Sequence, residues 1–346
     1  MRHRKLLVAA AVTAALSVLV APVSSGASDE SSPAGRPYGA PVIAPARELR
    51  GTARVELETS RDFRNIMAPQ GLSVLYCAIE KVACAEWKSA LRWVQGDVRW
   101  HEVPHSKRGF DFLDEWPVAE ANEVLNSPDW VRFVVVRQPH ERLLSAFGQK
   151  CRLHNWLTEY SNCPYLELFP SVFNGTVPDM RDVYTQRLIT DAFASRGEVV
   201  MFHEYATSVS HRVMEAPCEQ NLHYAPQYCH CSLDKTWPLF NFIRFGEGMA
   251  QEAADTFHAT GAFAAKAEGH DRPGAAPMVV RSEEEVLKFL REDMGSNHDT
   301  DGKQTNSADL VARFYTPELK DLVRKAFHRD FELFSQYWPS EEEAQA

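Results

Sequence analysis

Apolar and polar positions along the chain predict strands that alternate with helices. Residues 72–77 and 131–136 are short, nearly continuous apolar runs, and residues 198–202 and 240–245 are two more. Apolar runs of this length, rich in β-branched residues, are typical of strands that are buried on both faces of a sheet. Strands that alternate with helices indicate an α/β fold, in which a central, mostly parallel sheet is flanked by helices.

Helical periodicity follows these runs. Apolar residues recur at helical spacing from Trp87 to Val94, and Gly96 ends the pattern. Pro139 and Pro317 each stand where a first-turn proline is tolerated, and an apolar stripe follows both of them. Sheets of this kind bind their ligands at the carboxyl ends of the strands, where the helices begin.

The pattern of the N-terminus is typical of a targeting signal. A short basic tip precedes an Ala/Val/Leu-rich run over residues 6–23, which would span roughly 27 Å as a helix. We therefore expect residues 1–27 to be either a cleaved signal peptide or a signal anchor that holds the protein in a membrane. A buried N-terminal core helix is the third alternative. Both targeting alternatives place the chain in the secretory pathway, in the Golgi lumen as a type II membrane protein or secreted.

The remainder divides into two parts. Residues 28–55 are rich in Ser, Pro, Gly and Ala without periodicity, which predicts a flexible stem. Residues 56–340 are expected to form the folded domain, and a chain of 346 residues suits one large α/β domain or two small ones. The net charge of −10 argues against a protein that coats nucleic acid, so no nucleic-acid partner is expected. An anionic ligand would have to be held by a few focused cations and backbone amides.

The cysteine pattern favours disulfides in an oxidising compartment. The seven cysteines are Cys77, Cys84, Cys151, Cys163, Cys218, Cys229 and Cys231. An odd number leaves at least one thiol unpaired, and Cys151 with Cys163 is the pair we expect first. Cys229 and Cys231 offer a zinc fragment as an alternative, but zinc sites space their cysteines more widely, so we expect no metal. Asn174 begins the one N-glycosylation sequon, which matters if the chain is lumenal.

Two strand-to-helix junctions carry candidate binding residues. In residues 77–88, a tight loop would aim backbone N–H groups and a helix N-terminus at one spot, and Lys81 would add a positive charge. The Walker pattern G-x-x-x-x-G-K-[ST] is absent. In residues 136–147, a buried strand delivers Arg137 to its carboxyl end, where it suits a phosphate, and Ser145 follows about two helical turns later. The alternatives are a surface lysine without a ligand and an arginine that pairs with a nearby carboxylate.

The two junctions together resemble the Golgi carbohydrate sulfotransferases of the chondroitin/dermatan 4-O type. Their first loop reads roughly C-x-x-P-K-V-x-C-T-x-W-K and their second junction F-V-R-x-P-x-E-R-L-x-S-A-[YF]. The resemblance implies a P-loop-NTPase-like sulfotransferase fold and a site for 3′-phosphoadenosine 5′-phosphosulfate (PAPS). It assigns the 5′-phosphosulfate to the first junction and the 3′-phosphate to the second. The residues that it places at the donor are Lys81, Val82, Ala83, Cys84, Ala85, Glu86, Trp87, Lys88, Arg137 and Ser145.

The resemblance extends over residues 70–338, with departures. Residues 223–231 resemble the family's H-W-x-P-Q…C-x-x-C stretch, and residues 314–334 resemble its terminal Y-x-x-D-F-x-x-F helix. Glu80 stands where the family has Pro, and Ala85 stands where it has Thr or Ser. The loss of one hydrogen bond to a charged group costs about 1.5–3 kcal/mol.

The mechanism implied by the resemblance is in-line transfer of the sulfuryl group from PAPS to a hydroxyl of a carbohydrate acceptor. PAPS would be a co-substrate, and no tightly bound cofactor is expected. Lys81 would stabilise the charge on the leaving phosphate. A general base must accept the proton of the acceptor, and His105 and His223 are the candidates, with Glu102 and Glu247 as further ones.

Two other functions compete with this one. Glu80 and Ala85 are consistent with a lumenal pseudoenzyme that binds PAPS or a glycan without catalysis. A P-loop-like kinase is the second alternative, but the chain lacks a Walker lysine–serine pair and a clear pattern of Mg²⁺-binding carboxylates.

Overall fold

The structure, a computed structural model, describes residues 54–100, 107–150, 202–246, 248–263, 281–292, 294 and 307–338. All of them belong to the second of two compact units, which begins at Pro45. The predicted targeting segment 1–27 and most of the stem lie outside the described residues. So do Glu102, His105, Cys151, Cys163, Asn174, Glu247 and residues 198–201 of the third predicted strand.

The described strands form one sheet in the order β3-β1-β2-β4-β5. They are β1 (Ile66–Pro69), β2 (Val74–Cys77), β3 (Phe110–Phe112), β4 (Val131–Val136) and β5 (Asn241–Arg244). The pairs β2–β4 and β4–β5 are parallel, whereas β1 is antiparallel to both β2 and β3. The expectation of a mostly parallel sheet is therefore wrong for the described part, which is mixed. The link between β1 and β2 is too short for a crossover, so these two strands can only form a hairpin.

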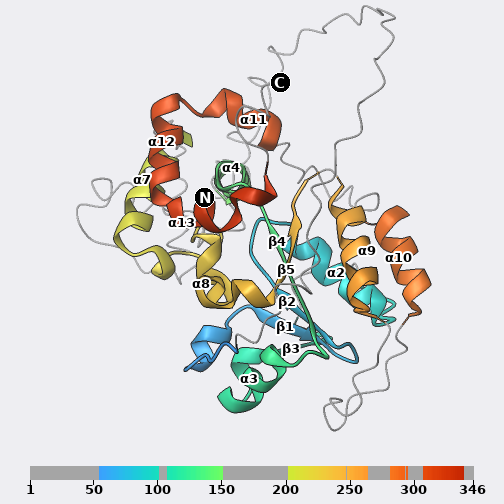
Figure 1. Cartoon of the computed structure of the whole chain (residues 1–346). Coiled ribbons are helices and arrows are strands. Elements are labelled where there is room, and N and C mark those ends of the chain that lie inside the picture. The colour runs from blue at the N-terminus through green and yellow to red at the C-terminus, as the bar shows by residue number, and fades with distance from the viewer. Residues whose placement is uncertain are drawn as a thin grey trace, which may run out of the picture. The chain divides into compact units, whose positions relative to one another are not determined.

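Helices surround this sheet (Figure 1). They are α2 (Cys84–Val94), α3 (Val118–Asn126), α4 (Pro139–Lys150), α7 (Phe202–Glu215), α8 (Leu233–Thr236), α9 (Met249–Thr260), α10 (Glu283–Glu292), α11 (Ser307–Phe314), α12 (Pro317–Ala326) and α13 (His328–Phe334). The short 3-10 helices are η1 (Ser60–Phe63), η2 (Leu113–Glu115), η6 (Pro217–Glu219), η7 (Gln227–Ser232), η8 (Trp237–Leu239) and η9 (Ser335–Tyr337). The predicted helix starts at Pro139 and Pro317 are confirmed. The third predicted strand is wrong at Phe202, which begins α7.

Aromatic side chains cover both faces of the sheet. On one face, Phe133 of β4 makes edge contacts with Trp87 of α2 and Phe257 of α9, at ring-centroid distances of 5.2 and 4.9 Å. On the other face, Phe242 of β5 packs against Phe334 of α13 at 5.3 Å. Because both faces are covered, every residue of β4 is buried, as its nearly continuous apolar sequence predicts.

A second apolar cluster joins α4, α7 and α12, and it includes Leu143, Tyr205 and Val323. It packs the helix that follows β4 against the C-terminal helices, so the end of β4 has support from distant parts of the chain. None of the described helices is long and apolar enough to cross a membrane.

Candidate active site

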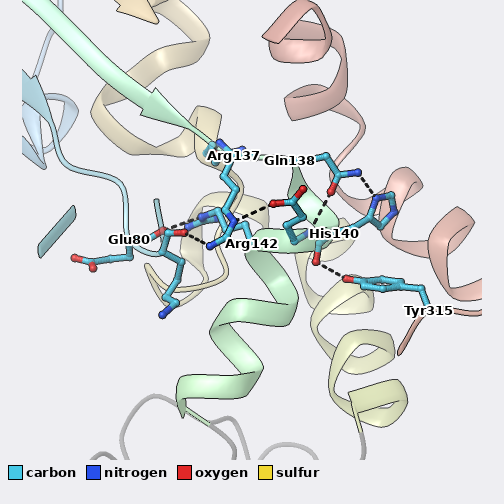
Figure 2. A network of polar contacts seen from close by, with 9 residues as sticks. Glu80, Arg137, Gln138, His140, Arg142 and Tyr315 are labelled. Atoms are coloured by element: carbon cyan, nitrogen blue, oxygen red, sulfur yellow. Dashed lines mark hydrogen bonds and ion pairs between the residues drawn. The ribbon is translucent and has the colours of Figure 1, made fainter. Parts of the chain in front are cut away.

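The two junctions singled out in the sequence meet at one edge of the sheet. β2 and β4 are parallel neighbours, with Cys77 opposite Val134, so the loop after β2 and the turn after β4 emerge side by side. The guanidinium of Arg137 donates from Nη1 to the backbone oxygen of Lys81 at 3.1 Å. Figure 2 shows Arg137 at the end of its strand, beside the loop that carries Glu80. The structure thus brings Lys81 and Arg137 together.

The loop between β2 and α2 has the shape of an anion-binding concavity. Lys81 and Ala83 both have left-handed backbone conformations, with φ of 71° and 64°, whereas Val82 between them does not. Such alternation turns successive N–H groups toward one point and forms a nest that accepts an anion. Ala83 is also the N-cap of α2 and supplies no side-chain cap, so the first-turn N–H groups of the helix face the same region. The conformation is strained for residues other than glycine, which is typical of functional loops.

Arg142 fastens this loop to the rest of the domain. Its Nε donates to the backbone oxygen of Glu80 at 2.9 Å, and its two terminal nitrogens donate to Ala225 O at 2.6 Å and Leu222 O at 2.9 Å. The side chain is buried, and burial lowers the pKa of Arg142 to about 10, so it remains charged at neutral pH. Sequence reasoning included Arg142 in the second motif but gave it no role.

One face of α4 is turned toward the loop. Lys81 Nζ donates to Gln149 Oε1, and Arg142 binds the carbonyl of the residue before Lys81. Ser145 lies three residues after Arg142 and four before Gln149, so it shares their helix face. The side chain of Ser145 is buried. The predicted donor residues Lys81, Arg137 and Ser145 therefore all lie where the loop and α4 meet.

The Arg137 side chain is surrounded by protein groups. Its Nε forms an ion pair with Glu141 Oε2 at 3.3 Å, and its guanidinium carbon lies 4.0 Å from the centroid of the Phe245 ring. Only 6% of Arg137 is exposed, and burial lowers the pKa of its guanidinium. The pairing with a carboxylate, which was the alternative to a phosphate contact, is present. Glu141 and an incoming phosphate would compete for the same donor groups.

The turn after Arg137 is locked by polar contacts (Figure 2). Gln138 Oε1 accepts from the N–H of Glu141 at 3.1 Å and so caps the start of α4. His140 Nε2 lies 3.1 Å from Lys320 O, and its Nδ1 lies 2.7 Å from the Gln138 amide nitrogen. Tyr315 donates to His140 O at 2.9 Å. Both ring nitrogens of His140 are therefore engaged by protein groups.

The substitution Glu80 has a defined place in the loop. Its Oε2 accepts a hydrogen bond from Cys84 Sγ at 2.9 Å. Burial, followed by the charge of Glu80, raises the pKa of the Cys84 thiol well above its ordinary value, so the group stays protonated and can donate. The Glu80 carboxylate is thus turned toward the first turn of α2.

The other predicted donor residues divide by burial. The side chains of Val82 and Trp87 belong to the apolar core, so they can offer a ligand only their backbone groups. Ala83, Ala85, Glu86 and Lys88 are half-buried at the start of α2. In the loop and the first turn of α2, a ligand would therefore be contacted mainly by backbone groups of the predicted residues.

Of the two candidate bases, the structure describes His223. Asn221 Oδ1 accepts from both the backbone N–H and the Nδ1–H of His223, at 3.0 and 2.8 Å. This tautomer leaves Nε2 as the basic nitrogen. The backbone oxygen of the neighbouring Leu222 accepts a hydrogen bond from Arg142 Nη2, which places the backbone of His223 close to the contacts that Arg142 makes with the loop.

Two disulfides frame the site. Cys77, the last residue of β2, is bonded to Cys231, and Cys218 is bonded to Cys229. The zinc alternative fails, because Cys229 and Cys231 are oxidised and bonded to different partners. Cys84 is the free cysteine of the described part. Within these same ranges no group of His, Cys, Asp and Glu could hold a metal ion.

A hollow of about 340 Å³ adjoins the network. Arg61, Arg64 and Lys235 line it together with Asp62 and Asp234. His230 also lines this hollow, and its Nε2 lies 3.5 Å from Arg142 Nη2. The hollow therefore lies next to the hydrogen bonds that Arg142 makes.

Together, the fold and the site define a class: an α/β protein in which a strand-to-helix loop with the shape of an anion-binding nest contacts an arginine at the end of the neighbouring parallel strand. The model of one family, the sulfotransferase family, matches residues 64–337. The chain therefore belongs to the sulfotransferase family.

Curated relatives are carbohydrate sulfotransferases. The chain is 24% identical over 181 residues to carbohydrate sulfotransferase 11 of Rattus norvegicus, which covers 50% of this chain and 47% of the relative. It is 26% identical over 180 residues to carbohydrate sulfotransferase 11 of Danio rerio, with the same coverage of 50% and 47%. Over 89 residues it is 35% identical to carbohydrate sulfotransferase 10 of Xenopus laevis, which covers 24% of each chain. The chain thus spans about half the length of the first of these relatives. No solved structure matches it.

Proposed function

We propose that this protein is a PAPS-dependent carbohydrate sulfotransferase. The observation that carries the proposal is the direct contact between the two junctions, in which Arg137 donates to the backbone of Lys81. A site for a donor with phosphates at both ends needs two anion-binding groups at one sheet edge, and the adjacent Lys81 loop and Arg137 are our candidates for them. We also propose that the sheet is the central sheet of a P-loop-NTPase-like sulfotransferase fold.

The donor would lie across the loop and the face of α4. The nest at Lys81 and Ala83 and the N-terminus of α2 would hold the 5′-phosphosulfate. Arg137 and Ser145 would hold the 3′-phosphate and so position the donor. Binding would redirect Arg137 from Glu141 and Lys81 from Gln149 toward the ligand.

The transfer would be an in-line displacement at sulfur. A bond forms between the acceptor oxygen and sulfur while the bond between sulfur and the phosphate oxygen breaks. Lys81 and the loop N–H groups stabilise the charge that builds on the leaving adenosine 3′,5′-bisphosphate. The acceptor proton goes to a base, for which His223 and His105 are the candidates. No tightly bound cofactor is required, and the acceptor is a carbohydrate hydroxyl, as the names of the relatives indicate.

The secretory pathway is the compartment that we propose, in the Golgi lumen or outside the cell. The two disulfides support an oxidising environment.

The test has a binding arm and a transfer arm. A thermal-shift comparison should show stabilisation by adenosine 3′,5′-bisphosphate and not by ATP, whereas stabilisation by ATP alone would exclude the proposal. Sulfate transfer from labelled PAPS is then measured over a panel of glycans. Lys81→Ala should lower the rate by roughly 10²–10³-fold, as for other groups that stabilise developing charge, and Arg137→Ala should abolish donor binding.

Lys288→Ala and Arg291→Ala are matched controls, because both side chains are exposed on α10, away from the loop. Wild-type transfer by both Lys81→Ala and Arg137→Ala would refute the donor site. Donor binding without transfer to any glycan would instead favour the pseudoenzyme.

A further inference from the structure

The backbone of Arg137 is held by a side chain from a distant part of the chain. Gln227 Oε1 accepts from the N–H of Arg137 at 2.9 Å, and Gln227 Nε2 donates to the carbonyl of Arg137 at 2.7 Å. Gln227 is fully buried. The reciprocal pair fixes both peptide groups of Arg137 at the point where strand β4 has ended and its regular pairing has ceased.

Gln227 is itself held by a buried carboxylate. Asp330 of α13 accepts from the N–H of Gln227 at 2.8 Å and from the N–H of Tyr228 at 2.9 Å, one on each oxygen. Asp330 is fully buried. Because both oxygens are used, the carboxylate fixes the position and the direction of η7 at its first residue.

We propose that Gln227 and Asp330 are positioning residues for the donor site, which hold the Arg137 backbone so that its guanidinium stays beside the Lys81 loop. The inference rests on the proposed function, since it takes Arg137 as the group that anchors the donor. Displacement of a positioning group by about 1 Å can cost on the order of 10²-fold in activity. Arg137 enters the site from the end of a strand, so a shift of its backbone moves the guanidinium directly.

A merely structural role predicts something else, and the chain offers a matched comparison. Asn122 clamps the backbone of Leu57 with the same geometry: its Oδ1 accepts from the N–H at 2.9 Å and its Nδ2 donates to the carbonyl at 2.8 Å. Asn122 is also buried, but it joins α3 to the segment before η1 and makes no contact with Arg137 in the hydrogen bonds described. Loss of either clamp removes one hydrogen bond to a backbone N–H and one to a backbone carbonyl. Only the Gln227 clamp touches the proposed donor site.

The experiment measures the Kd of adenosine 3′,5′-bisphosphate by calorimetry, together with the KM for PAPS, the KM for the acceptor and kcat. Gln227→Met and Asp330→Asn should each raise the Kd of the bisphosphate and the KM for PAPS by roughly tenfold or more, with the KM for the acceptor unchanged. Asn122→Leu should lower the Tm about as much as Gln227→Met does, because both variants lose a clamp of two hydrogen bonds. It should leave the Kd of the bisphosphate within about twofold of the wild-type value. If Gln227→Met does not fold, Gln227→Glu keeps the acceptor for the Arg137 N–H, loses the donor and gives the same measurement.

Two results would overturn the inference: wild-type Kd in the Gln227 and Asp330 variants, or an equal rise of Kd in Asn122→Leu. Arg137→Ala in the same titration separates this inference from the proposed function. If Arg137→Ala loses binding while Gln227→Met keeps it, only the positioning role fails. If wild-type protein does not bind the bisphosphate, or Arg137→Ala binds it like wild type, the donor site itself fails.

Discussion

The disulfide between Cys77 and Cys231 should be the more stabilising of the two that the structure describes. It joins residues 154 positions apart, whereas Cys218 and Cys229 are 11 apart. A crosslink lowers the entropy of the unfolded chain more when it closes a longer loop. The chain-entropy relation gives about 5 kcal/mol for the long loop and about 3 kcal/mol for the short one. The expected difference is therefore about 2 kcal/mol in the free energy of unfolding.

The perturbation is a pair of double variants, Cys77→Ala with Cys231→Ala and Cys218→Ala with Cys229→Ala. Alanine suits the long crosslink, because both of its cysteines are fully buried and a serine hydroxyl there would lack a partner. Urea denaturation at 25 °C without reductant gives the free energy of unfolding and the m-value of each protein. The reasoning is wrong if the variant without the short crosslink loses as much stability as the other, at equal m-values.

Two further predictions concern the loop and its surroundings. Ala85→Thr should restore a hydroxyl donor at the start of α2 and lower the Kd of adenosine 3′,5′-bisphosphate by about tenfold or more, for a charge-assisted hydrogen bond of about 1.5–3 kcal/mol; an unchanged Kd in calorimetry, with Ala85→Val as control, would contradict this. His230 is buried beside Arg142, and these causes lower its pKa to about 3, so its contribution to stability is complete above pH 6.5 and is lost as the pH falls toward 3. At pH 5 the free energy of unfolding should be lower by about 2 kcal/mol because of His230. Burial raises the pKa of Asp330 to about 6, so Asp330 changes the free energy of unfolding in the opposite direction as the pH falls. Urea denaturation from pH 7 to 5 should therefore show a weaker acid loss for His230→Gln than for wild type, and parallel curves would refute the role of His230.

Long, uniform patterns made part of the fold predictable. The nearly continuous apolar run at residues 131–136 became β4 with the same bounds, because a strand buried on both faces favours apolar side chains at most positions. Pro139 and Pro317 marked helix starts, since proline lacks an N–H that the first turn does not use. The proximity of the two junctions was also predictable, because the loops that follow two parallel neighbouring strands leave the sheet at the same edge.

Short strands and cysteine pairings were not predictable from local sequence. Strand β1 contains Pro69 and β3 has three residues, so their pairing partners rather than their own propensities make them strands. Cys229 and Cys231 are too close in sequence to suggest different partners. The chain turns through a left-handed conformation at Cys231, with φ of 55°, which directs the two sulfur atoms apart.

The residues that organise the candidate site were missed because their partners are backbone atoms. Arg142 binds three carbonyl groups, and Gln227 binds the peptide groups of Arg137. A sequence pattern reports which side chains are present and not which distant carbonyl each one meets. The signals were nevertheless in the sequence, because Arg142 and Gln227 both lie inside segments that the resemblance had matched.

The contacts of Glu80 bear on whether the loop can still work without the proline of the related pattern. A proline would stiffen the loop by fixing φ. Here the same stretch is held by other means, because Arg142 binds the carbonyl of Glu80, Arg137 binds that of Lys81, and the Glu80 carboxylate accepts from the Cys84 thiol. Two of these three contacts come from Arg137 and Arg142 of the second junction, so the second junction holds the first in place. The substitution is therefore compensated in the fold, and it argues against activity less strongly than the sequence alone implies.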